Sequence, residues 1–311
     1  MPITALPNEI ITSIFSLLPI KDLLTTTLIS KQLHVLAVCT LHHHLICLPT
    51  STPSLELILE AYHPSAKITT PYLSCRHLGF KGLPEEVQPT LESLAGIYSC
   101  FRPVVTEENR QRRFRMLWPG AAAPPAFSPD DVIDEEATED VHLDDGELFS
   151  QLCVATNVVK EGGKKGMFVK HVNISEDVMR IFRRWLTKHG AVNEDIQRKK
   201  WDDVGLDDDG VLWADLGKNI GLRFRVALAS AERMPLISGP DDEPAVSYSM
   251  VYEGTHYMRS LRHRNANWTE LIVRTRKLLL AVEKTSAELT NTEGGALIVS
   301  QLYRDIDPDD N

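Results

Sequence analysis

Three short amphipathic segments at residues 6–45, bounded by proline and polar residues, constrain the fold of this chain most. Pro7 suits the first turn of a helix, where its missing N–H has no helical partner, and Pro19 ends that helix. Asp22 suits the start of the second helix, because a carboxylate there accepts free N–H groups. The third segment carries a one-sided apolar stripe: Leu33, Leu36, Ala37, Thr40 and Leu41. Helices this short are marginal alone, so the sequence predicts three helices that bury their apolar faces against each other and against a further surface.

Residues 6–37 contain a long series of spaced residue pairs. The chain reads Leu-Pro, Glu-Ile, Ile-Phe, Leu-Pro, Asp-Leu, Leu-Ile-Ser-Lys and Leu-Ala in that order, from Leu6 to Ala37. This spacing resembles that of an F-box. A pattern this long has few chance matches, and an ordinary helical hairpin capping a larger domain leaves its two Leu-Pro pairs unexplained. One position departs from the family: Leu33 stands where an aromatic residue is usual. A leucine offers less contact area there, which bears on the affinity for a partner.

The resemblance implies that residues 1–45 form an F-box, placed as in fungal F-box proteins, which docks a Skp-type adaptor and through it cullin. The apolar content of these helices exceeds what their own packing hides, and an exposed apolar patch is expected to be an interface. By resemblance, the adaptor contact consists of Leu6, Pro7, Ile10, Ile14, Phe15, Leu18, Pro19 and Leu23.

Residues 46–118 alternate between strand-like and helix-like patterns. Leu45–Leu48 and Leu78–Phe80 are short apolar runs typical of strands, whereas Leu55–Tyr62 and Val87–Tyr98 are typical of helices. Two strand–helix units suggest a degenerate leucine-rich repeat, although two units do not establish one.

Residues 119–147 are rich in Ala and Pro and then acidic, with ten acids and no Lys or Arg. Such a segment buries too little apolar surface to offset the entropy lost on ordering. The sequence therefore predicts an acidic disordered linker or insertion here.

Residues 148–311 are predicted to form an α+β domain, which with the three leading helices makes the whole chain α+β. A helix is expected from Ser175, a natural N-cap, to Gly190. Strands are expected at 222–228 and 246–252, where apolar and polar residues alternate. A second long helix is expected after Asn267, with Glu270 completing a capping box. The apolar residues of the two helices are Val178, Ile181, Phe182, Trp185 and Leu186, and Trp268, Leu271, Ile272, Leu278, Leu279 and Val282.

Charge and cysteine content limit the classes of partner and location. The net charge of −10 comes from residues 119–147, and the remainder is nearly neutral. Neither nucleic acid nor a membrane is therefore an expected partner. The five cysteines are odd in number and form no CxxC, which favours a reducing compartment. Without a recognisable signal peptide or membrane-spanning run, we expect a cytoplasmic or nuclear protein.

Motifs for catalysis or metal binding fail on inspection. Cys39, His42, His43, His44 and Cys47 resemble a metal cluster, but no second ligand pair follows. Asp207–Gly210 lacks the carboxylates that a calcium loop needs at its ends, and Gly162–Gly166 fits a hairpin turn better than a phosphate loop. No nucleophile motif is present. The sequence therefore predicts no catalytic residue, metal or cofactor.

Two basic clusters are candidates for binding a client protein. Arg180, Arg183, Arg184 and Lys188 are predicted to share the polar face of the helix that ends at Gly190, and a second cluster occupies residues 259–264. Such rows are often solvated faces. Alternatively, they bind an acidic or phosphorylated degron through bidentate arginine contacts, or the acidic linker folds back on them.

These features together predict a substrate-recognition subunit of a Skp–cullin–F-box ubiquitin ligase, a non-catalytic role. The three leading helices would dock the adaptor, and residues 148–311 would select a client that the sequence does not identify. Two alternatives stay open: a scaffold that uses the adaptor outside the ligase, and an enzyme with a regulatory F-box.

Overall fold

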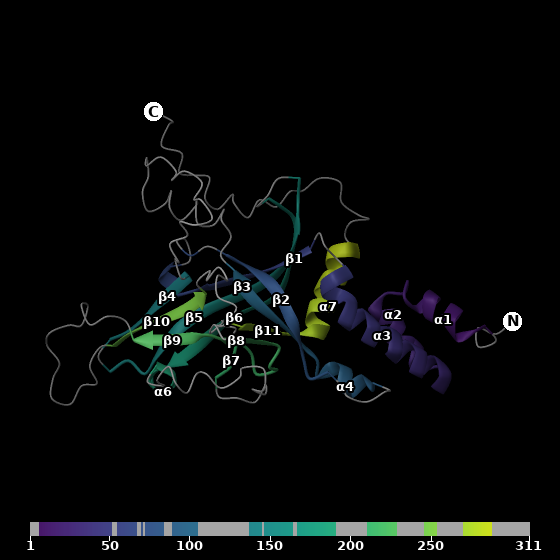
Figure 1. The fold of residues 1–311 in the computed structure, drawn as a ribbon, viewed down its shortest axis with the longest axis horizontal. Helices are drawn as coiled ribbons and strands as arrows, with labels where there is room; N and C mark the ends of the chain where they lie inside the picture. The colour runs from purple at the N-terminus through teal and green to yellow at the C-terminus, as the bar shows by residue number, and fades with distance from the viewer. Residues whose placement is uncertain are drawn as a thin grey trace, which may run out of the picture.

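A computed structural model shows how the helices and strands are arranged (Figure 1). The structure describes residues 6–51, 55–66, 70, 72–83, 89–104, 137–144, 146–163, 167–190, 210–228, 246–253 and 270–287.

The three predicted N-terminal helices are confirmed: α1 spans Asn8–Phe15, α2 Ile20–Thr26 and α3 Lys31–Ser51. Both α1 and α2 pack against α3. The run Leu45–Leu48, predicted as a strand, lies inside α3 instead. The helix continues because Leu45 follows Leu41 by one turn and both are buried in the main core.

An eight-stranded antiparallel sheet forms the body of the molecule, in the order β6-β5-β1-β2-β3-β11-β8-β7. Its two outer strands, β6 and β7, also lie close to each other, so the sheet is strongly curled. The strands are β1 Leu55–Tyr62, β2 Leu73–Lys81, β3 Tyr98–Val104, β5 Phe149–Glu161, β6 Phe168–Phe182, β7 Leu212–Trp213, β8 Ile220–Arg223 and β11 Glu270–Arg274. The segments predicted separately at 46–118 and 148–311 therefore contribute strands to one sheet.

A second, three-stranded sheet has the order β4-β10-β9, with β4 at Ala137–Leu143, β10 at Val246–Glu253 and β9 at Arg225–Leu228. The remaining helices are the short 3-10 turn η2 at Pro64–Ala66, α4 at Leu91–Ala95, α6 at Arg183–Gly190 and α7 at Thr275–Ala287. Helix α6 packs on β9, with the ring of Trp185 edge-on to that of Phe224, their centroids 5.5 Å apart. Helices combined with antiparallel sheets confirm the α+β class.

Helix α7 joins the three N-terminal helices to the large sheet (Figure 1). It contacts α3 on one side and strands β5, β6 and β11 on the other. Leu278 and Val282 of α7, Leu41 of α3 and Leu152 of β5 belong to one buried cluster. The N-terminal helices and the sheet thus share a hydrophobic core.

The expected helices at Leu55–Tyr62 and Val87–Tyr98 are wrong. The first is strand β1, whose buried residues lie on both faces, and such a strand is hard to distinguish from a helix by periodicity. Of the described residues of the second, 89–98, Leu91–Ala95 alone are helical, and Tyr98 begins β3. Because β1, β2 and β3 pair in sequence as antiparallel neighbours, the leucine-rich repeat is also wrong.

The helix expected at 175–190 is wrong in its first half. Residues up to Phe182 extend β6, and the helix begins at Arg183. Met179 and Ile181 are buried while Val178 and Phe182 are exposed. That alternation matches the period of a strand, and thirteen residues of β5 pair with it.

The second long helix also begins later than expected. Residues Glu270–Arg274 form β11, and α7 starts at Thr275; the expected cap, Asn267, lies outside the described residues. The Thr275 N–H donates to Ile97 O at 3.0 Å and its hydroxyl bonds that of Ser99 at 2.9 Å. Pairing with β3 therefore determines where the helix starts.

Of three further predictions from the sequence, one is partly wrong and two are confirmed. The strand expected at 222–228 is interrupted at Phe224, so its halves join different sheets as β8 and β9. The strand at 246–252 is confirmed as β10, and the hairpin turn after β5 is confirmed by Gly162 N–H donating to Met167 O at 2.7 Å.

The disordered segment expected at 119–147 is wrong for residues 137–143, which form β4 and pair with β10. Val141 and Leu143 of that strand are buried. Residues 119–136 lie outside the described residues.

Candidate functional site

The three-helix unit leaves a set of large apolar side chains exposed that its own packing does not cover. Its interior is formed by Ile11, Phe15, Leu23 and Leu33, none more than 2% exposed. Outside that interior, large apolar side chains remain exposed: Leu6, Ile10, Ile14, Leu17, Leu24, Leu28, Ile29 and Val35. Apolar side chains gathered in this number on one small unit are typical of a protein interface. We call this set the apolar face.

The structure divides the eight residues predicted to contact an adaptor into two groups. Leu6, Pro7, Ile10, Ile14 and Pro19 are exposed, and Leu18 is half-buried. Phe15 and Leu23, in contrast, are 2% and 0% exposed. These two side chains hold the helices of the unit together, so a partner docking in this conformation does not reach them.

Sequence reasoning missed five members of the apolar face: Leu17, Leu24, Leu28, Ile29 and Val35. Helical spacing offered a signal for one of them. Leu17 follows Ile14 by three residues and Ile10 by seven, a helical spacing in the sequence, although in the structure Leu17 lies in the turn just after α1.

Hydrogen bonds between its segments hold the three-helix unit in shape. Gln32 Nε2 on α3 donates to Asn8 Oδ1 at the start of α1, at 3.0 Å. His34 Nδ1 lies 3.1 Å from Thr27 O, at the end of α2. These contacts join α1 and α2 to α3 and so determine where the apolar face lies.

The first N–H of α2 is capped by a residue 263 positions further along the chain. Pro19 provides no side-chain cap, and the Ile20 N–H donates to Glu283 Oε1 of α7 at 2.8 Å. A carboxylate at a helix N-terminus is favoured by the local dipole and by the unsatisfied N–H groups. This bond, together with the shared core, fixes the three-helix unit relative to the sheet.

The histidine and cysteine group at the end of α3 shows local contacts. Cys47 Sγ lies 3.6 Å from His43 Nδ1. Burial, and then the neighbouring His43, lower the pKa of His44, while Glu283 opposes the shift. Within the described part of the chain, no three His, Cys, Asp or Glu side chains are placed to hold a metal ion.

The basic residues predicted to share a helix face do not share one. Arg180 lies on β6, with its guanidinium 5.1 Å from the centroid of the Phe149 ring. Arg183 is 8% exposed and donates to Glu147 O at 2.9 Å and to Asp144 O at 2.7 Å, so it holds the turn before β5.

Arg184 and Lys188 are exposed on α6. The exposed basic residues are thus Arg180, Arg184 and Lys188, and the second predicted cluster at 259–264 lies outside the described residues.

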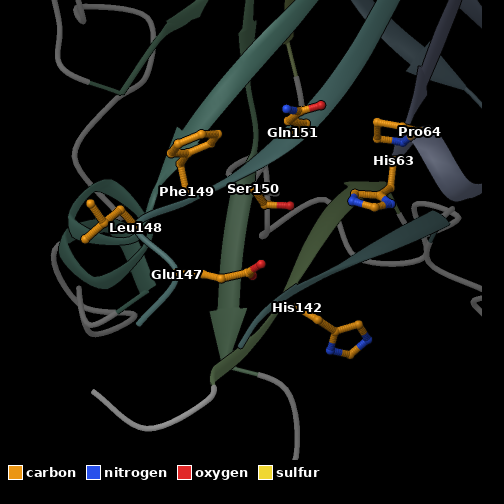
Figure 2. Close-up of a pocket in the computed structure, with 8 residues that line it drawn as sticks. All are labelled: His63, Pro64, His142, Glu147, Leu148, Phe149, Ser150 and Gln151. Carbon is orange, nitrogen blue, oxygen red and sulfur yellow. The ribbon is translucent and has the colours of Figure 1, made fainter. Parts of the chain in front are cut away.

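A pocket of about 570 Å³ opens next to Phe149, whose ring lies under Arg180, between the start of β5, the end of β4 and the residues after β1 (Figure 2). It is lined by His63, Pro64, His142, Glu147, Leu148, Phe149, Ser150 and Gln151. Leu148 and Phe149 lie on one side and the two histidines on the other.

The large sheet contains a polar cluster in which Glu270 accepts from both Lys81 Nζ and Arg223 Nη1, each at 3.0 Å. The cluster connects strands β2, β8 and β11. Burial, and then the nearby Glu270, raise the pKa of the Cys100 thiol, and burial likewise raises that of Cys75. Both thiols are held in the protonated form, which is a poor nucleophile. The cluster therefore fits a structural role.

None of the described helices combines the length and apolar character needed to cross a membrane.

Comparison with known families gives one match. Residues 3–48 match the family model described as F-box-like, so the chain carries an F-box-like domain that coincides with the three-helix unit. No curated protein and no solved structure matches the chain. F-box domains bind Skp-type adaptors, and this domain implies a general role in substrate recognition by ubiquitin ligases of the Skp–cullin–F-box class. Proteins with this domain are typically non-catalytic ligase subunits.

Proposed function

Because residues 3–48 form an F-box-like domain, we propose that this protein is a substrate-recognition subunit of a Skp–cullin–F-box ubiquitin ligase. Its apolar face docks the Skp-type adaptor, and its sheet domain binds the client. The observation that carries the proposal is the exposure of Ile10 and Ile14 on α1, and of Leu17 and Leu28 in the turns after α1 and α2.

The free energy gained when a partner buries the apolar face supports the proposal that this face docks the adaptor. Leu17 and Leu28 are 85% and 87% exposed, and fully burying a leucine side chain contributes about 1.5–3 kcal/mol. Because several exposed apolar side chains lie on this unit, a partner can bury more than one of them as an anchor of the interface. Within a well-packed interface, each central anchor typically costs about 2 kcal/mol or more when truncated.

The attachment of the F-box-like domain to the sheet supports the proposal that the sheet domain binds the client. A ligase gains rate by holding the client near the charged ubiquitin enzyme, which is an effect of effective concentration. A rigid connection between the adaptor-binding domain and the client-binding domain limits the positions that a bound client can occupy, and so raises its effective concentration near the charged enzyme. Here that connection is α7, through its apolar contacts with α3 and the Glu283–Ile20 bond.

The experiment is affinity purification of the intact protein, followed by identification of the proteins bound to it. We expect both a Skp-type adaptor and cullin with the wild-type chain, and neither with Ile14→Asp, Leu17→Asp. The matched control is Leu216→Asp, which also places a charge at an exposed leucine but lies far along the chain from the F-box-like domain. Recovery of the adaptor without cullin would favour a scaffold outside the ligase. Absence of both from the wild type would refute the proposal.

A further inference from the structure

An exposed strip at one end of the β5–β6 pair combines apolar and basic side chains. We call it the hairpin-end surface, and it consists of Phe149 and Gln151 on β5 and Val178, Arg180 and Phe182 on β6. The register places Phe149 opposite Phe182 and Gln151 opposite Arg180. Because alternate residues of a strand share a face, these five side chains lie on the same side of the sheet.

The apolar part of this surface is open to solvent. Val178 is 57% exposed, Phe182 is 51% exposed and the adjoining Leu148 is 69% exposed. The rings of Phe149 and Phe182 contact each other, with centroids 5.8 Å apart. Clustered apolar side chains that the fold leaves uncovered are typical of a binding surface.

The pocket adjoins this surface and provides a place for one side chain. Its volume of about 570 Å³ is within the range of ligand sites. Phe149 belongs to both the strip and the pocket wall, and Leu148 extends the apolar side (Figure 2). Glu147 also lines the pocket, and its carboxylate repels an anion there. A side chain without negative charge therefore suits the pocket, and Pro64, Leu148 and Phe149 offer it apolar contacts.

The charge around the strip is complementary to an acidic partner. Arg180 lies over the Phe149 ring, and a guanidinium stacked on a ring keeps its planar N–H groups for a carboxylate. Arg184 and Lys188 are exposed on α6, which follows β6 directly. The acids of the same strand, Glu176 and Asp177, precede Val178, and Asp144 and Glu147 of the turn before β5 lie beside the basic residues at the α6 end.

We propose that the hairpin-end surface binds the client through an extended acidic segment. One apolar side chain of that segment enters the pocket, and its carboxylates contact Arg180 and Arg184. The inference rests on the proposed function and adds to it the location of the client site and the chemistry of its ligand. The surface lies at the end of the molecule away from α1 and α2 (Figure 1), so adaptor and client bind together without competition.

The test is selection of random twelve-residue peptides, displayed on phage, against the intact protein. Selected peptides are expected to carry a large apolar residue flanked by Asp or Glu. Their affinities are then measured by fluorescence anisotropy. Arg180→Glu, Arg184→Glu is expected to weaken binding by at least about tenfold, which corresponds to about 1.4 kcal/mol.

Three further variants test the binding site and control for nonspecific effects. Phe149→Ala removes the shared wall of strip and pocket, and a similar loss is expected. Arg276→Glu is the matched control, because it reverses an exposed charge on α7 and is expected to leave the affinity unchanged. Arg180→Gln repeats the test with a milder change, and thermal unfolding of each variant shows that it is folded.

Three results would overturn the inference: no peptide selected, peptides without acidic residues, or unchanged affinity in the Arg180→Glu, Arg184→Glu variant. Peptide binding that appears only after neutralising the acids at 130–136 would also overturn it, because the occupant would then be this chain's own acidic segment. Adaptor binding is measured separately on the same variants. Its absence from the wild type would refute the proposed function without affecting the peptide result.

Discussion

Replacing Glu283 by Ala tests whether α7 holds the F-box-like domain against the sheet. The change removes the acceptor of the Ile20 N–H, a bond of 2.8 Å between α7 and the first residue of α2. A hydrogen bond to a charged group contributes about 1.5–3 kcal/mol, and loss of a helix cap typically costs about 1 kcal/mol. Because water reaches the half-buried Glu283 and replaces part of the bond, we expect a loss of about 1–2 kcal/mol in the free energy of unfolding.

Two assays measure this effect. For a chain of this size, 1 kcal/mol shifts Tm by about 2–4 °C, so Glu283→Ala is expected to lower Tm by about 2–8 °C. Hydrogen exchange followed by mass spectrometry is more local, since faster exchange is expected in a peptide covering residues 19–26. Glu283→Gln retains an acceptor oxygen and should show a smaller effect.

Lys284→Ala is the matched control, because it changes the next, exposed residue of the same helix. If Glu283→Ala and Lys284→Ala give the same Tm and the same exchange at residues 19–26, the bond does not support the junction. The reasoning that the F-box-like domain is rigidly attached would then be refuted.

Three further predictions concern packing and reactivity. Arg183→Ala is expected to destabilise the fold by about 1.5–3 kcal/mol, because buried bonds to two carbonyls are lost, whereas Arg184→Ala should be neutral; equal urea midpoints would contradict this. Phe15→Ala should cost about 3–5 kcal/mol, while Leu17→Ala should stay within about 0.5 kcal/mol, as checked by chemical denaturation. Because the pKa of Cys100 is raised, its thiol stays protonated at pH 8, so mass spectrometry should find it unalkylated until the protein unfolds; rapid native labelling would count against this.

The N-terminal helices could be predicted because their signals are local. Pro7 precedes α1 by one residue, and Leu33 and Leu41 of the predicted stripe are both buried; Pro19, expected to end the first helix, instead precedes α2 by one residue. Such signals depend on neighbours within a few residues. The same holds for the hairpin turn at Gly162, where a short stretch determines the geometry.

Residues 175–190 show why the rest of the fold is harder to predict from the sequence. Val178, Ile181 and Phe182 satisfy helical spacing, yet the segment up to Phe182 is a strand because β5 pairs with it. Pairing between distant strands is a tertiary effect that overrides local periodicity. Strand pairing also overrides the local signal at Glu270. The sequence predicts that this residue caps a helix, but it lies on β11, paired with Arg223 of β8.

For the candidate site too, local signals could be predicted from the sequence, whereas features set by tertiary contacts could not. The resemblance located the F-box-like domain, but it did not distinguish Phe15 and Leu23, which are buried, from Leu17 and Leu28, which are exposed. Contact with α3 decides that difference, and the order of residues does not show it. The role of Glu283 was equally hidden, since its partner lies 263 residues earlier.

Titration of a purified Skp-type adaptor into the intact protein, by isothermal calorimetry, tests the central claim most directly. The wild type should bind with a negative heat-capacity change, the signature of apolar burial. Ile14→Asp, Leu17→Asp should weaken binding by at least about a hundredfold, or about 2.7 kcal/mol, with unchanged thermal stability. Equal affinities for the two proteins, or no binding by the wild type, would contradict the account.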